Sequence, residues 1–218
     1  MKKIWQNIDD AVKKQLLVDK GLNDFLKSIF PIETERQKFI QKCVRKIKTR
    51  RMLLRAQWYT EMANDQENVR QNRPALKLIF LMALAEALAK QRIGTIHIGS
   101  FDAIKEFFKY ISEDDKRILS RGFKRAMLKL KHHNLRFFSI LKVLYNIRNS
   151  AVHGEDYFSF SLMDPENKRM EPNLSILTSG YLGSKKRKTR VSLDVKLTYE
   201  ELRDVFVRTA ILNIKYII

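Results

Sequence analysis

The most apolar stretch of the chain is Pro74–Gln91, PALKLIFLMALAEALAKQ. Pro74 fits the first position of a helix, where its missing N–H costs nothing. The following residues are apolar nearly all round the helix, which is typical of a helix buried at the centre of a bundle. Between its two lysines stands a single carboxylate, that of Glu86. Leu78–Ala89 is only about half of a bilayer span, so we expect a buried helix and no membrane partner.

The region before this helix is also expected to be helical. Ile4–Asp19 carries a helical apolar stripe, and a shorter apolar segment follows at Leu22–Phe30. Thr34–Ala63 is expected to form one long helix, and the polar segment Asn64–Arg73 then precedes Pro74. We therefore divide the chain into a basic helical N-terminal extension, residues 1–73, and a main domain, residues 74–218.

The main domain is expected to continue as helices. Ser100 and Ser112 are candidate N-caps for helices that reach about Ile111 and Leu130. Asn134 is a candidate cap for a third helix, which ends at Gly154 because glycine is the usual residue just beyond a helix C-terminus.

The residue pattern of the sequence changes after residue 154. Short β-type runs, separated by proline and glycine, lie at Tyr157–Leu162, Leu174–Thr178 and Val191–Leu197. Thr198 and Glu201 then form a capping-box pattern that opens a last helix to about Ile217. The predicted fold class is mainly α, a helical bundle with a small β-hairpin-like insertion before the last helix.

Composition narrows the class of protein further. The chain has 218 residues and one cysteine, Cys43, so it has neither an intramolecular disulfide nor a cysteine-based zinc site. The N-terminus, MKKIWQNIDDAVKKQ, is charged and lacks the apolar core of a signal peptide. We therefore expect a soluble protein in a reducing, cytoplasmic compartment.

The chain is strongly basic, with 43 Lys+Arg against 24 Asp+Glu and a formal net charge of +19. The excess is spread along the chain and is not confined to a tail. A basic surface favours polyanions, and nucleic acid is the commonest of these. The alternative is a set of solvated lysines with no partner.

The helix that ends at Gly154 has an unusual distribution of polar residues. Wound at about 100° per residue, Ile140–His153 places an apolar stripe on one side: Ile140, Leu144, Ile147 and Ala151, extended by Leu141, Tyr145 and Val152. The opposite stripe is polar: Lys142, Asn146, Asn149 and His153. Arg148 falls inside the apolar arc, where an unpaired charge costs several kcal/mol. Glu86 is the candidate partner, and a partly exposed Glu86 without this role remains the alternative.

One copy of this helix lacks a second proton-transfer group. Cleavage of a phosphodiester needs a base, an acid and charge stabilisation at phosphorus. A two-fold dimer would supply two histidines and two arginines to one cleft. Ala151 is small and near the helix end, so it would allow two helices to approach closely.

The sequence Arg148-Asn149-Ser150-Ala151-Val152-His153-Gly154 resembles the signature of the HEPN superfamily, an Arg and a His separated by four to six residues, the first of which is usually polar, such as Asn. That all-helical family includes ribonuclease toxins, abortive-infection proteins and CRISPR-associated nucleases. The resemblance implies a homodimer that cleaves RNA without a metal or cofactor. It assigns His153 as general acid or base, Arg148 as the phosphate-stabilising group and Asn149 as a positioning group, with Glu86 in a supporting position.

The same loose pattern also matches Arg92…His97 and Arg125…His132. The first pair straddles Gly94 in an expected loop, and the second lacks the Asn and closes on a double histidine. His132 and His133 are adjacent, so they point in different directions on a helix, and no third ligand is spaced to complete a metal site.

Further RNA contacts are expected from basic residues near the motif. The candidates are Lys142 on the motif helix and the expected hairpin tip SKKRKTR, with Lys185, Lys186, Arg187, Lys188 and Arg190. A second basic surface lies on the helix Thr34–Ala63, opposite Phe39, Cys43, Ile47 and Leu54; its residues are Lys42, Arg45, Lys46, Lys48, Arg50, Arg51 and Arg55. We interpret this surface as a solvated helix face that helps to hold RNA without reading its sequence.

The resemblance therefore predicts an endoribonuclease, with a toxin or phage-defence effector as its setting and an antitoxin or regulatory protein as a partner. The alternative is a non-catalytic HEPN-like module that binds RNA or nucleotide or serves as a dimerisation scaffold. A basic helical RNA-binding protein with an accidental motif is the third hypothesis, and it predicts a monomer that tolerates substitution of His153.

Overall fold

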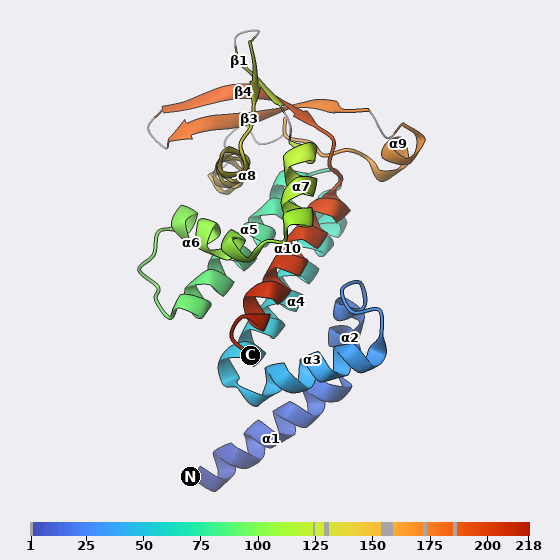
Figure 1. Cartoon of the computed structure of the whole chain (residues 1–218), viewed down its shortest axis with the longest axis vertical. Helices are drawn as coiled ribbons and strands as arrows, with labels where there is room; N and C mark the ends of the chain where they lie inside the picture. The colour runs from blue at the N-terminus through green and yellow to red at the C-terminus, as the bar shows by residue number, and fades with distance from the viewer. Residues whose placement is uncertain (1, 124, 129–130, 154–158, 172–173, 185–186) are drawn as a thin grey trace.

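The computed structural model describes residues 2–123, 125–128, 131–153, 159–171, 174–184 and 187–218. The protein is mainly helical with a small antiparallel sheet, as the sequence predicts. Figure 1 shows the sheet at one end of an elongated molecule and the N-terminal helices at the other. These N-terminal helices are α1 (Lys2–Val18), α2 (Lys20–Lys27) and α3 (Glu33–Arg45).

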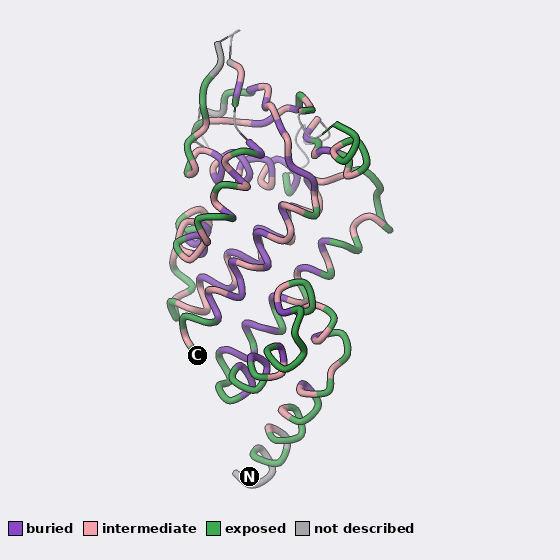
Figure 2. The backbone as a smooth tube through the Cα atoms, turned by 45° about the vertical axis from the view of Figure 1, so that its right-hand side comes forward, coloured by how far each residue is buried: buried purple, intermediate pink, exposed green. Residues whose placement is uncertain are grey.

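Three long helices run side by side between the two ends: α4 (Ile47–Val69), α5 (Pro74–Ile93) and α10 (Tyr199–Lys215). Pro74 is the first residue of α5, and Gly94 ends it in the left-handed conformation with φ of 83°. Leu81, Met82 and Leu84 of α5 are completely buried. In Figure 2 the buried segments follow these central helices, whereas the helix at the N-terminus is largely exposed. The prediction that α5 lies in the core is confirmed.

Shorter elements surround this centre. They are α6 (Ser100–Phe107), the 3-10 turn η1 (Phe108–Tyr110), α7 (Glu113–Gly122), α8 (Phe137–Val152) and α9 (Pro165–Met170). The sheet has the order β2-β1-β4-β3, with β1 (Arg125–Leu128), β2 (Lys131–Asn134), β3 (Ile176–Ser184) and β4 (Arg187–Val195). The capping box of Thr198 and Glu201 opens α10 as expected. Within the described residues, no helix is both long and apolar enough to cross a membrane.

The expectation of one helix over Thr34–Ala63 is wrong. Lys46 has an extended backbone (φ −113°, ψ 131°) that separates α3 from α4. The Thr49 hydroxyl holds this corner by donating to the Cys43 and Lys46 carbonyls at 2.6 and 3.0 Å. The break changes the phase of the helix, so Ile47 and Leu54 are exposed and do not continue the buried side of α3. The polar segment after Ala63, taken as a boundary, remains helical to Val69.

The helix expected to reach Leu130 ends at Gly122, although Ser112 caps its start as predicted. The carbonyl of Gly122 accepts the N–H of Lys196 at 2.9 Å instead of continuing the helix. The chain then forms the hairpin β1–β2, and β1 pairs with β4 from Arg125 opposite Asp194 to Met127 opposite Ser192. This pairing joins segments far apart in sequence, so tertiary contacts override the local helical pattern.

Other boundaries also differ from the sequence predictions. Gly99, not Ser100, is the N-cap of α6, and the expected continuation to Ile111 is the 3-10 turn η1. Asn134 belongs to β2, and Arg136 is the N-cap of α8.

The run predicted at Tyr157–Leu162 forms no strand over its described part. The backbone N–H of Ser161 donates to the Thr178 hydroxyl, and this hydroxyl donates to the Ser159 carbonyl. The segment therefore lies beside β3 without a regular ladder of backbone hydrogen bonds. The other two runs overlap β3 and β4.

A buried amide connects three helical segments at the centre. Asn213 on α10 is fully buried; its amide donates to the Phe107 and Thr209 carbonyls at 2.9 Å, and its Oδ1 accepts from Arg92 Nε at 3.1 Å. Asn213→Ala is expected to lower the free energy of unfolding by about 2–3 kcal/mol, because the Phe107 carbonyl and Arg92 Nε lose partners in a buried site.

Urea denaturation would measure this change. The matched control is Asn64→Ala, because Asn64 is exposed and accepts one bond from the Tyr199 hydroxyl. The control is expected to change stability by less than about 0.5 kcal/mol. Equal effects of the two substitutions would contradict the role given to the buried amide.

Candidate functional site

The motif helix α8 lies between α5 and the sheet (Figure 1). Ile140, Leu144 and Ile147 are buried as the helical projection predicts. Ala151 is also buried, so it faces the core of its own chain and is not available for contact with a second copy. Val152, which was placed at the edge of the apolar stripe, is 49% exposed.

The polar stripe of α8 is not uniformly exposed. Asn146 is buried beneath β3, where its amide donates to the Tyr181 carbonyl at 3.0 Å and the Gly183 carbonyl at 3.4 Å. Asn146 therefore anchors the sheet on α8. Asn149, one turn further along α8, is partly exposed, and His153 is exposed.

Arg148 forms the predicted ion pair with Glu86 of α5, with 3.4 Å between Nη2 and Oε1. The Glu86 side chain is 12% exposed and that of Arg148 is 22% exposed. Lys90, one turn along α5, lies 3.9 Å from the other oxygen of Glu86. Two opposite charges and a nearby ammonium thus lie together at the edge of the core.

The contact of Arg148 with Glu86 is electrostatic and lacks hydrogen-bond geometry. Within the described part of the chain, Glu86 Oε1 and Arg148 Nε are buried without a hydrogen-bond partner. Arg148 Nη1 instead donates to Asn149 Oδ1 at 2.9 Å. The guanidinium is therefore oriented on two sides, while its Nε–H has no acceptor among these residues.

His153 is the residue after the last turn of α8. Its backbone N–H donates to the Asn149 carbonyl at 3.0 Å, which fixes its place relative to the Arg148–Asn149 pair. In the part of the chain that the structure describes, its imidazole has no hydrogen bond or ion pair, and it faces solvent. Gly154 lies outside the described residues. The structure thus brings Glu86, Arg148 and Asn149 together, with the exposed His153 one turn from Asn149.

The candidate RNA-contacting residues do not form one cluster. Lys142 lies over the rings of Phe101 and Tyr145, with 4.3 and 5.0 Å to their centroids, on the α6 side of α8. Arg190 is exposed on β4 and donates to Ser179 Oγ through Nε and Nη2 at 3.3 and 3.1 Å. Lys185 and Lys186 lie outside the described residues, as do the side chains of Arg187 and Lys188.

The backbone nevertheless relates this hairpin to the motif. Asn146 binds the carbonyl of Gly183, which is the residue before the end of β3 at Ser184. Asn146 precedes Asn149 by about one helical turn. The end of strand β3 therefore lies about one turn of α8 away from the Arg148–Asn149 pair.

The other matches to the loose pattern are in different settings. Arg92 bonds to Asn213, Tyr110 and Glu106, whereas His97 is exposed in the loop after Gly94. Arg125 and His132 belong to β1 and β2. The described residues contain no group of three His, Cys, Asp or Glu side chains that could hold a metal ion. Burial raises the pKa of the Cys43 thiol to about 12, so this thiol is an unreactive part of the core.

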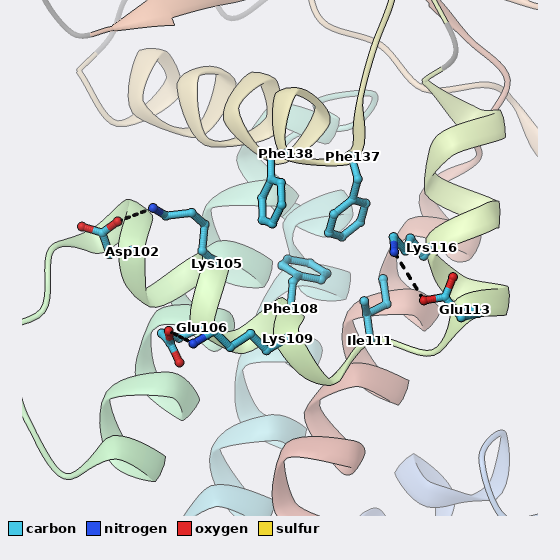
Figure 3. Close-up of a pocket in the computed structure, with 10 residues that line it drawn as sticks. All are labelled: Asp102, Lys105, Glu106, Phe108, Lys109, Ile111, Glu113, Lys116, Phe137 and Phe138. Atoms are coloured by element: carbon cyan, nitrogen blue, oxygen red, sulfur yellow. Dashed lines mark hydrogen bonds and ion pairs between the residues drawn. The ribbon is translucent and has the colours of Figure 1, made fainter.

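The sequence did not indicate the cavity of about 590 Å³ between α6, α7 and the start of α8. Figure 3 shows Phe137 and Phe138 extending from α8 toward Phe108, with lysines around the rim. Each lysine pairs with a carboxylate three residues away: Lys105 with Asp102, Lys109 with Glu106 and Lys116 with Glu113. The charges at the rim of the cavity are thus compensated. The cavity lies about 23 Å from His153, measured along α8. The Phe-Phe dipeptides at 107–108 and 137–138 are the sequence feature that could have indicated this cavity.

Comparisons of the chain with protein-family models, curated proteins and solved structures found no match.

Proposed function

We propose that this protein is a HEPN-type, metal-independent endoribonuclease with a composite active site formed by two copies of the chain. The observation that carries the proposal is the arrangement at the end of α8. Arg148 is oriented by Glu86 and Asn149, and the exposed His153 follows one turn after Asn149. An arginine at the edge of the core can bind a phosphate, and an accessible imidazole one turn after its Asn149 partner can transfer a proton.

The face of α5 beside Arg148 supports the dimer. A stripe of α5 residues is only partly buried: Ile79, Phe80, Ala83, Glu86, Ala87 and Lys90. Ala83 and Ala87 are small and one turn apart, so a second helix could approach this face closely. Val152 adds exposed apolar area at the end of α8. A two-fold contact here would place two copies of His153 on opposite sides of one scissile phosphate.

The proposed reaction is attack of an RNA 2′-hydroxyl on the adjacent phosphorus. One His153 takes the 2′-proton while the new O2′–P bond forms, and the other gives a proton to O5′ as the P–O5′ bond breaks. The two arginines stabilise the additional negative charge on the phosphoryl oxygens. The products are a 2′,3′-cyclic phosphate and a 5′-hydroxyl. DNA lacks the nucleophile and would not be cut.

The setting that the resemblance implies is a toxin or phage-defence effector in the cytoplasm, held inactive by an antitoxin or regulatory protein. The net charge of +19 supports RNA as the substrate, because it favours binding to a polyanion.

The reaction class is tested with end-labelled RNA and a DNA of the same sequence, in excess EDTA. The expected result is cleavage of the RNA alone, with cyclic-phosphate ends. RNA binding without cleavage under these conditions would favour the non-catalytic module, in which the ion pair of Arg148 with Glu86 serves stability.

Glu86 is a positioning residue in this mechanism. Glu86→Gln removes the charge that orients Arg148 but keeps the volume of the side chain. We expect kcat to fall about tenfold, equivalent to ~1.4 kcal/mol, with little change in KM. Full activity in this variant would contradict the role of Glu86. Glu86→Asp keeps the negative charge and should retain part of the activity that Glu86→Gln loses. A purely structural role of the carboxylate at this position does not predict this rescue.

A further inference from the structure

The segment from Arg36 to Thr60 contains nine Lys and Arg residues and no acidic residue. It covers most of α3, the corner at Lys46 and the first half of α4. Among the described residues, only Arg50 of this segment forms an ion pair, and its partner is Asp9 of α1. Hydrogen bonds from Lys13 and then Arg50 lower the pKa of Asp9, so that this carboxyl remains ionised. For the other eight cations, the described part of the chain provides no side-chain carboxylate partner.

Several of these cations are held in place by neutral groups. Lys48 Nζ donates to the Arg92 carbonyl at 2.8 Å, and Arg55 Nη1 donates to Gln91 Oε1 at 2.8 Å. Carbonyl and amide oxygens orient a cation without cancelling its charge. This differs from the cavity in Figure 3, where each rim lysine has a carboxylate partner. This segment therefore presents cations without carboxylate partners, which the rim of the cavity in Figure 3 does not.

An exposed indole lies within the basic area. Lys48, Arg51, Leu54, Arg55 and Trp58 are spaced by three or four residues, so they share one face of α4, which we call the α4 face. Trp58 is 56% exposed, and the centroid of its ring lies 5.1 Å from that of Tyr59, with 45° between the ring planes. An exposed aromatic ring among unpaired cations is the arrangement that binds single-stranded nucleic acid, since unpaired bases stack on the ring and phosphates meet the cations.

The α4 face is connected to the motif through α5. Arg55 contacts Gln91, the next residue to Lys90, and Lys90 approaches Glu86, the partner of Arg148. Helix α5 packs against both α4 and α8. With two interhelical spacings of about 8–10 Å each, the α4 face and Arg148 are roughly 20 Å apart. A strand within the range of about 4–16 nucleotides that single-strand-binding domains hold could reach both.

We propose that the α4 face binds single-stranded RNA, with Trp58 stacking on an unpaired base and Arg51 and Arg55 contacting the flanking phosphates. The stacking and charge arguments specify a single-stranded nucleic acid; the choice of RNA rests on the proposed function. The α4 face would hold the strand that passes from Trp58 over α5 to the motif.

The test measures fluorescence anisotropy of a labelled single-stranded RNA with the full chain in a His153→Ala background, so that binding is separated from cleavage. Trp58→Ala is expected to weaken binding about tenfold and to leave the salt dependence unchanged. Arg51→Gln is expected to weaken binding and to reduce the slope of log affinity against log salt by about 0.7, the value for one phosphate contact on a single strand.

The matched controls come from the cavity in Figure 3. Phe138 is a 61% exposed aromatic residue and Lys105 is a carboxylate-paired cation, so Phe138→Ala and Lys105→Gln should leave RNA affinity unchanged. Equal effects of the control and α4-face substitutions would overturn the proposal. Preference for duplex RNA would overturn it as well, and equal affinity for single-stranded DNA would overturn the assignment to RNA.

A second copy of the chain is the competing occupant of the α4 face. If Trp58→Ala dissociates a dimer while the RNA affinity stays the same, Trp58 is a subunit contact and the proposal fails. This test measures binding and not cleavage. A protein that binds RNA through the α4 face but does not cleave it would therefore overturn the proposed function and leave the present proposal intact.

Discussion

His153→Ala is expected to reduce RNA cleavage by about 10²–10⁴-fold, the contribution that a general acid or base makes. In the proposed composite site each chain supplies one of the two imidazoles, so the substitution would remove both the acid and the base. His153 is exposed, and within the described residues its side chain makes no hydrogen bond. The loss should therefore appear in kcat without a change in RNA affinity or in the circular dichroism spectrum.

The control for this result is His97→Ala. His97 is also exposed and also follows an arginine at the spacing of the loose motif, but it lies in the loop after Gly94. It is expected to retain full activity. Equal cleavage by wild type and His153→Ala would reject the motif assignment.

The second large effect is expected for Arg148. Arg148→Ala should reduce cleavage by about 10²–10³-fold, because the phosphoryl charge in the transition state loses its donor. Arg148→Lys should restore little, since an ammonium cannot contact Glu86, Asn149 and a phosphate through one planar group. The readout is single-turnover cleavage at saturating protein.

Arg148→Ala also leaves the largely buried Glu86 with Lys90 as its remaining cationic neighbour, so part of the loss could come from unfolding. The double variant Glu86→Leu/Arg148→Met removes both charges and keeps the packing volume; it should fold and remain inactive. Arg117→Ala, at an exposed arginine paired with Asp114, is the matched control. Substantial cleavage by the folded double variant would contradict the role of Arg148.

The pairing of Arg148 with Glu86 could be predicted because each is the exceptional charge on an otherwise apolar helix face. A buried charge needs a partner, and Glu86 is the one carboxylate between the two lysines of α5. The capping box at Thr198 and the proline at the start of α5 were equally predictable, because caps depend on residues within one turn. These features are local or follow from the cost of desolvating a charge.

Other features depend on contacts that a local pattern does not contain. The run from Arg125 to Asn134 is basic and carries no turn signal, and it becomes a hairpin because β1 pairs with β4 some 65 residues later. Asn146 shares a helical stripe with His153, yet the sheet that covers α8 buries it. The corner at Lys46 has neither proline nor glycine, and Thr49 stabilises it through carbonyls that the sequence does not mark.

The central claim is that two chains form one active site, and a purified heterodimer tests it most directly. Wild-type chains and Arg148→Ala/His153→Ala chains would carry different tags, be co-expressed and be isolated through both tags. A shared site predicts that the heterodimer cleaves RNA far more slowly than half the rate of the wild-type dimer. A heterodimer with half the wild-type rate would show that each chain cleaves on its own, and failure to recover any heterodimer would contradict the dimer itself.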